Sequence, residues 1–332
     1  MAISPTETER RSEGGEVAVV EAPAAKSPTR LAIARFRKDK LSMAAFIVVA
    51  ILAIGAILAP VLVKLGVLDY STLHQNLTDP SNGGGPIQAH GGISGSHPLG
   101  VVPGTGWDVL SRLWLGVAFS IGICLCATIV SVVLGTVLGI IGGYSRGMLD
   151  AVIGRLVDLT LSFPQTLMLL ALSAPIVAFF NNKLHLHGNL ANALYIIVVL
   201  GFFGWPSVAR LVRGQVLSIR EREFIDAARS LGASNSRIYF REILPNVWAP
   251  LLVVSTLLLP SYVSAEAALS YLGVGVQAPL PTLGNVLSDA TAWIDGDPLY
   301  FWIPAIVISV VVVSFNLLGD GLRDALDPKG DR

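Results

Sequence analysis

Charged residues are scarce in this chain of 332 residues. Only 14% are Asp, Glu, Lys or Arg, whereas ordinary globular domains contain about a quarter. Because 53% of the residues are hydrophobic, this scarcity indicates an integral membrane protein rather than a soluble domain. The 23 basic and 23 acidic residues cancel, so the chain has no overall positive charge with which to recruit nucleic acid.

Catalytic and ligand-binding patterns are also missing. Cys124 and Cys126, the only cysteines, lie two apart in an apolar stretch, and we interpret them as packing residues rather than as a disulfide or metal pair. His185 and His187 are too weak a pattern to predict a metal site. There is no Gly-x-x-x-x-Gly-Lys-Ser/Thr motif, so we expect no nucleotide on a P-loop of this chain. The sequence therefore predicts neither an enzyme nor a chain that holds its own cofactor.

Long apolar stretches recur along the chain. A helix that crosses a membrane needs about 20 mostly apolar residues. Six stretches reach or approach this length: Leu41–Leu65, Leu113–Ile141, Leu156–Phe180, Leu190–Val212, Val247–Ala268 and Phe301–Leu318. Prolines fall inside or beside several of them, so we expect kinked or broken helices. The sequence predicts an all-α polytopic protein with about six transmembrane helices.

Basic residues predict the orientation, because they gather on the cytosolic side of membrane spans. They cluster before the first stretch, after the second and fourth, and after the last: Arg30, Arg35, Arg37, Lys38, Lys40, Arg146, Arg155, Arg210, Arg213, Arg220, Arg222, Arg229, Arg237, Arg241, Arg323, Lys329 and Arg332. Residues 246–302, in contrast, contain no Lys or Arg. We therefore expect both termini in the cytosol.

The segments outside the spans complete the predicted organisation. The first forty residues are rich in Glu, Pro, Ala and Ser, a composition that favours disorder and does not resemble a secretory signal. Residues 80–95 are rich in glycine and predict a flexible external loop. The expected parts are a disordered cytosolic tail 1–40, an N-terminal span 41–65, an extracytoplasmic loop 66–112, a core 113–320 with a cytosolic loop 213–246, and a cytosolic tail 321–332.

Glycines recur every four residues in the second apolar stretch, at Gly135, Gly139 and Gly143. Small residues on one face of a helix allow another helix backbone to approach closely. We interpret them as a packing face, within this chain or against a partner helix, rather than as solute contacts.

Two carboxylates, Asp158 and Glu266, fall in or near the apolar stretches. A carboxylate at the bilayer centre costs on the order of 2.5–3.5 kcal/mol on insertion scales, so both are candidates for a transport pathway. Arg155 precedes Asp158 by three residues, and an ion pair between them is the favoured interpretation. Glu266 has no basic residue in its flanking loop, and an aqueous pathway and a structural role remain equally open for it.

The most informative segment is 223–246, which is charged and lies between two apolar stretches. Helix formers at 226–229 lead to Gly232, which can close a helix in the left-handed conformation. Ser234 can cap a second short helix, which we expect Pro245 to end. Two short helices that mix apolar and basic residues are poorly suited to lie free in water. We therefore expect another protein to cover them.

This segment resembles the E-A-A loop of bacterial ABC importer permeases, whose pattern is E-A-A, three residues, Gly, nine residues and I-x-L-P. The chain has Asp226-Ala227-Ala228, then Gly232, then Glu242-Ile243-Leu244-Pro245. Asp replaces the first Glu of the pattern, and Glu242 stands where the pattern has Ile.

Three further motifs narrow the resemblance. His-Pro-Leu-Gly at 97–100 followed by Asp-Val-Leu-Ser-Arg at 108–112, Ala-Glu at 265–266 followed by Leu-Ser-Tyr-Leu-Gly-Val-Gly at 269–275, and the ending 316–328 all look like segments of dipeptide/oligopeptide permeases. From about Leu31 to Lys329 the chain is similar to the C-type permease subunit of peptide/nickel ABC importers. Residues 101–108 depart from the family's usual T-D-x-x-G-R-D.

The resemblance implies a type I ABC importer permease (MetI-like) core with an extra N-terminal helix, in the bacterial inner membrane. The implied partners are a homologous B-type permease, two ATPase subunits or one fused ATPase that bind ATP and Mg, and an extracytoplasmic substrate-binding protein. The implied ATPase-coupling residues are Glu223, Phe224, Asp226, Ala227, Ala228, Arg229, Leu231, Gly232, Leu244 and Pro245. Packed contacts with an ATPase would also suit Ile225, Ile238, Tyr239 and Phe240.

The implied cargo is a dipeptide or oligopeptide, while nickel chelates and haem-like solutes stay open. The main alternative is an ion-coupled secondary transporter that uses Asp158 and Glu266. Such transporters are built from inverted repeats, and the sequence shows no such symmetry. A membrane scaffold without transport would explain the spans and leave the E-A-A loop unexplained.

Overall fold

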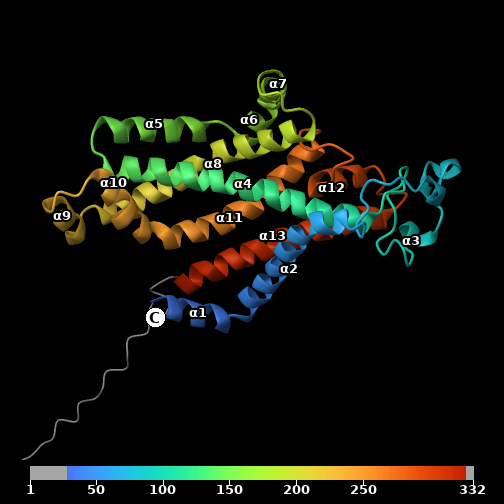
Figure 1. Cartoon of the computed structure of the whole chain (residues 1–332), viewed down its shortest axis with the longest axis horizontal. Helices are drawn as coiled ribbons and strands as arrows, with labels where there is room; N and C mark the ends of the chain where they lie inside the picture. The colour runs from blue at the N-terminus through green and yellow to red at the C-terminus, as the bar shows by residue number, and fades with distance from the viewer. Residues whose placement is uncertain (1–27, 327–332) are drawn as a thin grey trace, which may run out of the picture.

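The computed structural model describes residues 28–326, and in that part of the chain nearly all secondary structure is helical. Five long helices run along the molecule (Figure 1): α2 (Lys40–Lys64), α4 (Val109–Tyr144), α8 (Asn189–Ile219), α11 (Leu244–Tyr271) and α13 (Pro298–Leu326). All five are long and apolar enough to cross a membrane, and a bent helix pair raises the number to six. The prediction of an all-α protein with about six spans is confirmed.

Short elements join the long helices. They are α1 (Pro28–Lys38), η1 (Gln75–Leu77), β1 (Thr78–Asp79), η2 (Pro80–Asn82), β2 (Gly85–Pro86), α3 (Ala89–Gly92), α5 (Met148–Ser162), α6 (Gln165–Ala171), α7 (Ser173–Lys183), α9 (Glu223–Ser230), α10 (Asn235–Arg237), the π-helical η3 (Ile238–Ile243) and α12 (Leu283–Thr291). α9 and α10 lie at one end of the bundle, whereas α3 and α12 lie towards the other (Figure 1). We call these the α9 end and the α12 end.

The closest helix packing joins α4 to α8. A Cβ atom at Gly135 would lie 2.5 Å from Cβ of Val208, and one at Gly139 would lie 2.7 Å from Cβ of Val212. Gly143 meets α8 in the same way one turn further on. No larger side chain fits at these distances, so the glycines let the two helix backbones touch. The packing interpretation is confirmed, and the partner helix belongs to the same chain.

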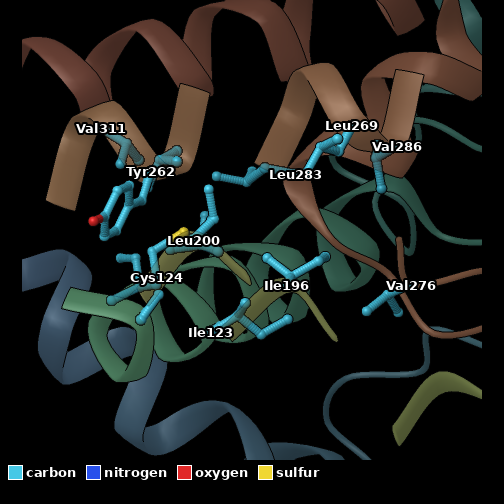
Figure 2. Close-up of a cluster of buried hydrophobic side chains, with 14 of the residues drawn as sticks. Ile123, Cys124, Ile196, Leu200, Tyr262, Leu269, Val276, Leu283, Val286 and Val311 are labelled. Carbon is cyan, nitrogen blue, oxygen red and sulfur yellow. The ribbon is translucent and has the colours of Figure 1, made fainter. Parts of the chain in front are cut away.

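The main hydrophobic core lies where α4, α8, α11, α12 and α13 meet. Figure 2 shows part of it, in which Cys124 and Ile196 face Tyr262, Leu283 and Val311. Cys124 is a free, buried thiol, as expected of a packing residue, while Cys126 on the same helix is exposed. The core therefore ties α12 to four of the long helices, α4, α8, α11 and α13.

The predicted third span, Leu156–Phe180, is not one helix. The chain forms α5, α6 and α7 instead, and α6 and α7 meet at a bend of 43°. Pro164 stands just before the first residue of α6. Proline lacks a backbone N–H and disfavours the helical conformation in the residue before it, so α5 ends and a new helix begins here. α5 consequently runs beside α4 and α8 at the edge of the bundle (Figure 1).

Two segments expected to be disordered or flexible have defined structure. Residues 28–38 form the helix α1, whose Phe36 packs edge-on against Phe46 of α2 at 6.2 Å between ring centroids. Asp39 and Lys40, the last two residues of the predicted N-terminal tail, cap and begin α2. Residues 1–27 of that tail lie outside the described residues, as do residues 327–332 of the C-terminal tail. The glycine-rich loop carries the β1–β2 hairpin, with Thr78 opposite Pro86. Apolar contacts of α1 and the turns allowed by glycine explain the difference from the composition.

Candidate functional site

The segment with the E-A-A pattern begins with a short helix and a tight turn. α9 ends where Gly232 adopts a left-handed φ of +76°. The backbone N–H of Gly232 donates to the carbonyl of Arg229 at 2.9 Å, and the N–H of Ala233 donates to that of Ala228 at 3.0 Å. Other side chains are strained at this φ, which is why glycine closes the helix. The first half of the segment has the local geometry that the sequence predicts.

The second half of the segment differs from the prediction. Ser234 caps α10 by accepting from the N–H of Arg237 at 3.4 Å, as expected. α10 then passes through the π-helical η3 into α11, which begins at Leu244, so Pro245 lies in its first turn and does not end a helix. A proline is tolerated in a first turn, and a π-helical turn before it rearranges the backbone hydrogen bonds. One helical rod, Asn235–Tyr271, therefore links this segment to the membrane.

α9 has an inner and an outer face. Ile225 is fully buried and packs with Ile238 in a cluster between α4, α8 and α11, so neither residue is available to a partner. Ala228 is half-buried on the same side. The opposite side carries an outer stripe of Phe224, Ala227 and Leu231, in which Phe224 is 40% and Leu231 87% exposed. The apolar residues of this segment thus divide between support of the helix and an open surface.

Arg229 holds the inner face to the bundle. Its Nε donates to the Tyr144 hydroxyl at 3.0 Å, and its guanidinium lies 4.9 Å from the centre of that ring. Tyr144 in turn packs edge-on against Tyr239 at 5.2 Å. The hydrogen bond to Tyr144 raises the pKa of Arg229, and the nearby Asp226, whose carboxylate lies 3.2 Å away, acts in the same direction. α9 is therefore fastened to the last residue of α4.

A hollow of about 930 Å³ opens beside the start of α9. Its lining is largely polar and includes Gln215 and Ser218 of α8, Glu223 and Phe224 of α9, and Asn246 of α11. The first two predicted coupling residues thus border a concave surface at the α9 end.

Glu266 is fully buried in the interior of the α12 end. Its carboxylate accepts hydrogen bonds from the hydroxyls of Ser120 and Ser270, each at 2.9 Å. The Ser120 oxygen also accepts from the backbone N–H of Leu283 at 3.0 Å, and Leu283 is the first residue of α12. Glu266 therefore joins α4, α11 and α12, and in this conformation it has a structural role and no contact with solvent.

Asp158 is exposed and forms an ion pair, but not with Arg155. The guanidinium of Arg210 on α8 lies 3.1 Å from its carboxylate. The Asp158 side chain is 67% exposed and that of Arg210 is 62% exposed. The expected ion pair exists with a different partner, because α8 runs alongside α5 and presents Arg210. Sequence spacing carries no signal for this contact between two helices.

Within residues 28–326, no three His, Cys, Asp or Glu side chains lie close enough together to hold a metal ion. His97 instead pairs with Asp108 at 3.0 Å in the segment that precedes α4.

A family model supplies the first comparison with known proteins. The model of the family described as binding-protein-dependent transport system inner membrane component matches residues 135–331, which is more than half of the chain. The chain belongs to this family. A second model, described as the N-terminal TM domain of oligopeptide transport permease C, matches residues 27–80 and so includes α1 and α2.

Curated relatives of this transport family match nearly the whole chain. The dipeptide transport system permease protein DppC of Alkalihalophilus pseudofirmus is 38% identical over 92% of this chain and 91% of its own length. The oligopeptide transport system permease protein OppC of Bacillus subtilis is 35% identical over 90% of this chain and 88% of its own. The glutathione transport system permease protein GsiD of Escherichia coli is 34% identical, over 89% and 88%.

A solved structure agrees in fold. The inward-facing methionine ABC transporter MetNI has a chain that superposes with a TM-score of 0.52 at 19% identity, covering 66% of this chain and 97% of that chain. The predicted family, the MetI-like fold and the assignment as an ABC transporter permease subunit rather than an enzyme are confirmed.

Proposed function

We propose that this chain is the C-type permease subunit of an ATP-driven importer of dipeptides or oligopeptides. The outer stripe of α9 carries the proposal, because it is an apolar surface on a helix that the chain itself holds rigidly. The names of the relatives, which include dipeptide, oligopeptide and glutathione transport, support a peptide as the solute.

In this proposal α9 inserts into a cleft of an ATPase subunit. Shifting a two-state gate from 1:99 to 99:1 takes about 5.5 kcal/mol of differential binding. An exposed salt bridge contributes about 0–1 kcal/mol, so a few arginines are not enough. Burial of a Leu or Phe side chain contributes about 1.5–3 kcal/mol, and the stripe offers Phe224 and Leu231. Apolar packing of the stripe is therefore the main source of the coupling energy.

The same proposal places the α9 end in the cytosol of a bacterial cell. Arg146, Arg220 and Arg229 converge there, through contacts with Glu221, the Gly143 carbonyl and Tyr144. Positive charge marks the cytosolic side of membrane spans. The α12 end then faces the substrate-binding protein, a homologous permease completes the pathway, and ATP and Mg bind to the ATPase subunits.

The test is to purify the tagged chain from its native membrane in mild detergent and to identify the accompanying proteins by mass spectrometry. We expect a homologous permease and an ATPase pair or one fused ATPase. A Leu231→Glu variant should retain the permease and lose the ATPase. A lone wild-type chain that moves solute in vesicles without ATP would instead support an ion-coupled transporter that uses Asp158 and Glu266.

A further inference from the structure

A charged groove runs between α5 and α8, outside the α9 segment and the Glu266 network. It has a volume of about 300 Å³ and a floor that includes the buried residues Ile153, Val157 and Ala209. Its walls carry charges of both signs, contributed by Asp150, Arg155, Asp158, Arg210 and Arg213. Such a concentration of charge on two helices of an otherwise apolar bundle requires an explanation.

The charges form two cross-helix pairs of different character. Two guanidinium nitrogens of Arg213 donate to the two carboxylate oxygens of Asp150, at 2.7 and 3.0 Å. The side chains of this pair are less exposed than those of the other pair. Arg210 reaches Asp158 through a single contact of 3.1 Å, and both side chains are mostly exposed. The first pair is built to hold α5 against α8, whereas the second is open on one side.

The open pair lies beside the contact between α4 and α8. Arg210 stands between Val208 and Val212, which pack on Gly135 and Gly139 of α4. The apolar stretch of α4 continues beyond Gly139 towards the α9 end. Arg210 lies within α8, one of the helices long and apolar enough to cross a membrane. Charged side chains within a span are costly against lipid and nearly always face the bundle interior or a water-filled cavity. A water-filled surrounding therefore suits the exposed side of the groove.

We infer that the α5–α8 groove is a wall of the aqueous translocation pathway, where Asp158 and Arg210 exchange their mutual contact for the charged ends of a zwitterionic solute. This inference rests on the proposed importer function. An exposed pair is weak, so it opens at little cost and does not trap the solute. The Asp158 carboxylate suits a solute ammonium group and the Arg210 guanidinium suits a carboxylate, which are the two ends of an unmodified peptide.

Water access to the groove can be tested with a Gly154→Cys variant in the full transporter complex reconstituted in lipid. Gly154 lines the groove, and a Cβ added there meets no atom within 4 Å, so the variant should fold. Native Cys126 is the internal control, because it is exposed on the apolar face of α4 beside Leu125 and Ile129.

The probe is a charged, membrane-impermeant methanethiosulfonate reagent. We expect it to modify the Gly154→Cys thiol roughly tenfold faster than Cys126, because only a hydrated thiol ionises readily. A transported dipeptide should slow the modification. If the variant complex hydrolyses ATP in response to the binding protein but its new thiol stays unmodified with and without nucleotide, the groove is covered by the partner permease and the inference is wrong.

The charge assignment has a separate readout, the uptake of a free dipeptide relative to the same dipeptide with an amidated C-terminus. Arg210→Gln should lower this ratio, and Asp158→Asn should leave it unchanged while reducing uptake of both peptides, by up to about fivefold. The binding protein is the same throughout, so its own selectivity cancels from the comparison of variants. Equal losses of both peptides in Arg210→Gln would overturn the assignment. Absence of any ATPase from the wild-type complex would instead refute the importer proposal.

Discussion

α9 and α12 are short helices of eight and nine residues that join long helices at opposite ends of the bundle. α12 buries five of its residues and begins with a capping box in which Thr282 and Asn285 bond each other's backbone. α9 buries only Ile225 and has no side-chain cap at its start. The contrast indicates that α12 belongs to the interior of this chain, whereas α9 leaves most of its surface uncovered, as the proposed contact with an ATPase subunit requires.

Both helices are nevertheless tied to α4. Ser120 of α4 bonds the first residue of α12, and Tyr144, the last residue of α4, bonds Arg229 of α9. The glycine face of α4 packs α8 against it between these two points. A movement imposed on α9 would therefore displace α4 and α8 together, and the contacts of α12 would have to move with them or break.

The largest effect is expected from Glu266→Ala, which leaves the hydroxyls of Ser120 and Ser270 buried without their acceptor. Each unsatisfied group costs about 1–3 kcal/mol, so α12 should loosen and the melting temperature of the purified chain should fall by several degrees. Glu266→Gln retains a carbonyl acceptor and is the matched control, with a smaller shift expected. Thermal unfolding followed by tryptophan fluorescence measures both. Equal melting temperatures for all three proteins would mean that the hydrogen bonds of Glu266 do not hold α12 in place.

Gly232→Pro should come next, with uptake lost and membrane insertion retained. Proline fixes φ near −65°, whereas Gly232 has φ +76° and donates its N–H to Arg229. Gly232→Ala is the graded control: its Cβ has open space, so only the left-handed penalty of about 1–2 kcal/mol applies. Uptake assays with matched membrane levels of each variant provide the measurement. Normal uptake by Gly232→Pro would argue against a rigid α9 in coupling.

Leu231→Glu should weaken binding of the ATPase subunit without changing the melting temperature of the chain, because Leu231 contacts little within the bundle. Loss of one buried leucine from an interface corresponds to roughly tenfold weaker binding or more. Leu231→Ala should have an intermediate effect. Quantitative co-purification gives the comparison, and wild-type recovery of the ATPase with Leu231→Glu would place the interface on another surface.

Tyr144→Phe should have the smallest effect. It removes the hydroxyl that accepts from Arg229 but keeps the ring beneath the guanidinium and the ion pair with Asp226. A hydrogen bond from a charged donor contributes about 1.5–3 kcal/mol when it is lost without replacement. The Arg229 side chain is partly exposed, so water can replace the hydroxyl and uptake should change only a few-fold. The hydroxyl raises the pKa of Arg229, but the guanidinium stays charged near neutral pH without it, so no new pH dependence is expected. A loss as large as that of Gly232→Pro would show that this bond carries the coupling.

Much of the architecture is written locally in the chain. Apolar length identifies the spans, because each must satisfy its backbone within one helix across the bilayer. Glycines at intervals of four residues predict a packing face, and Gly232 predicts a helix end, since both depend on a missing side chain. The family motifs are short and contiguous, so the sequence alone contains them in full.

Contacts between distant segments were decided only by tertiary structure. Local spacing pointed to Arg155 as the partner of Asp158, but the position of α8 supplies Arg210. Burial of Ile225 and Ile238 depends on three other helices, so an apolar pattern alone could not separate them from the exposed Leu231.

Asp158 and Glu266 differ in what the sequence and the tertiary structure determine about them. The sequence by itself determined that Asp158 and Glu266 fall in or near apolar stretches and need partners, because an unpaired charge is costly in a membrane span. Tertiary structure decided that Glu266 is enclosed by hydroxyls from two helices and Asp158 lies open on a groove. The physical reason is that the surroundings of a side chain are set by which helices pack beside it, and hydrogen bonds and ion pairs between helices carry no signature in local spacing.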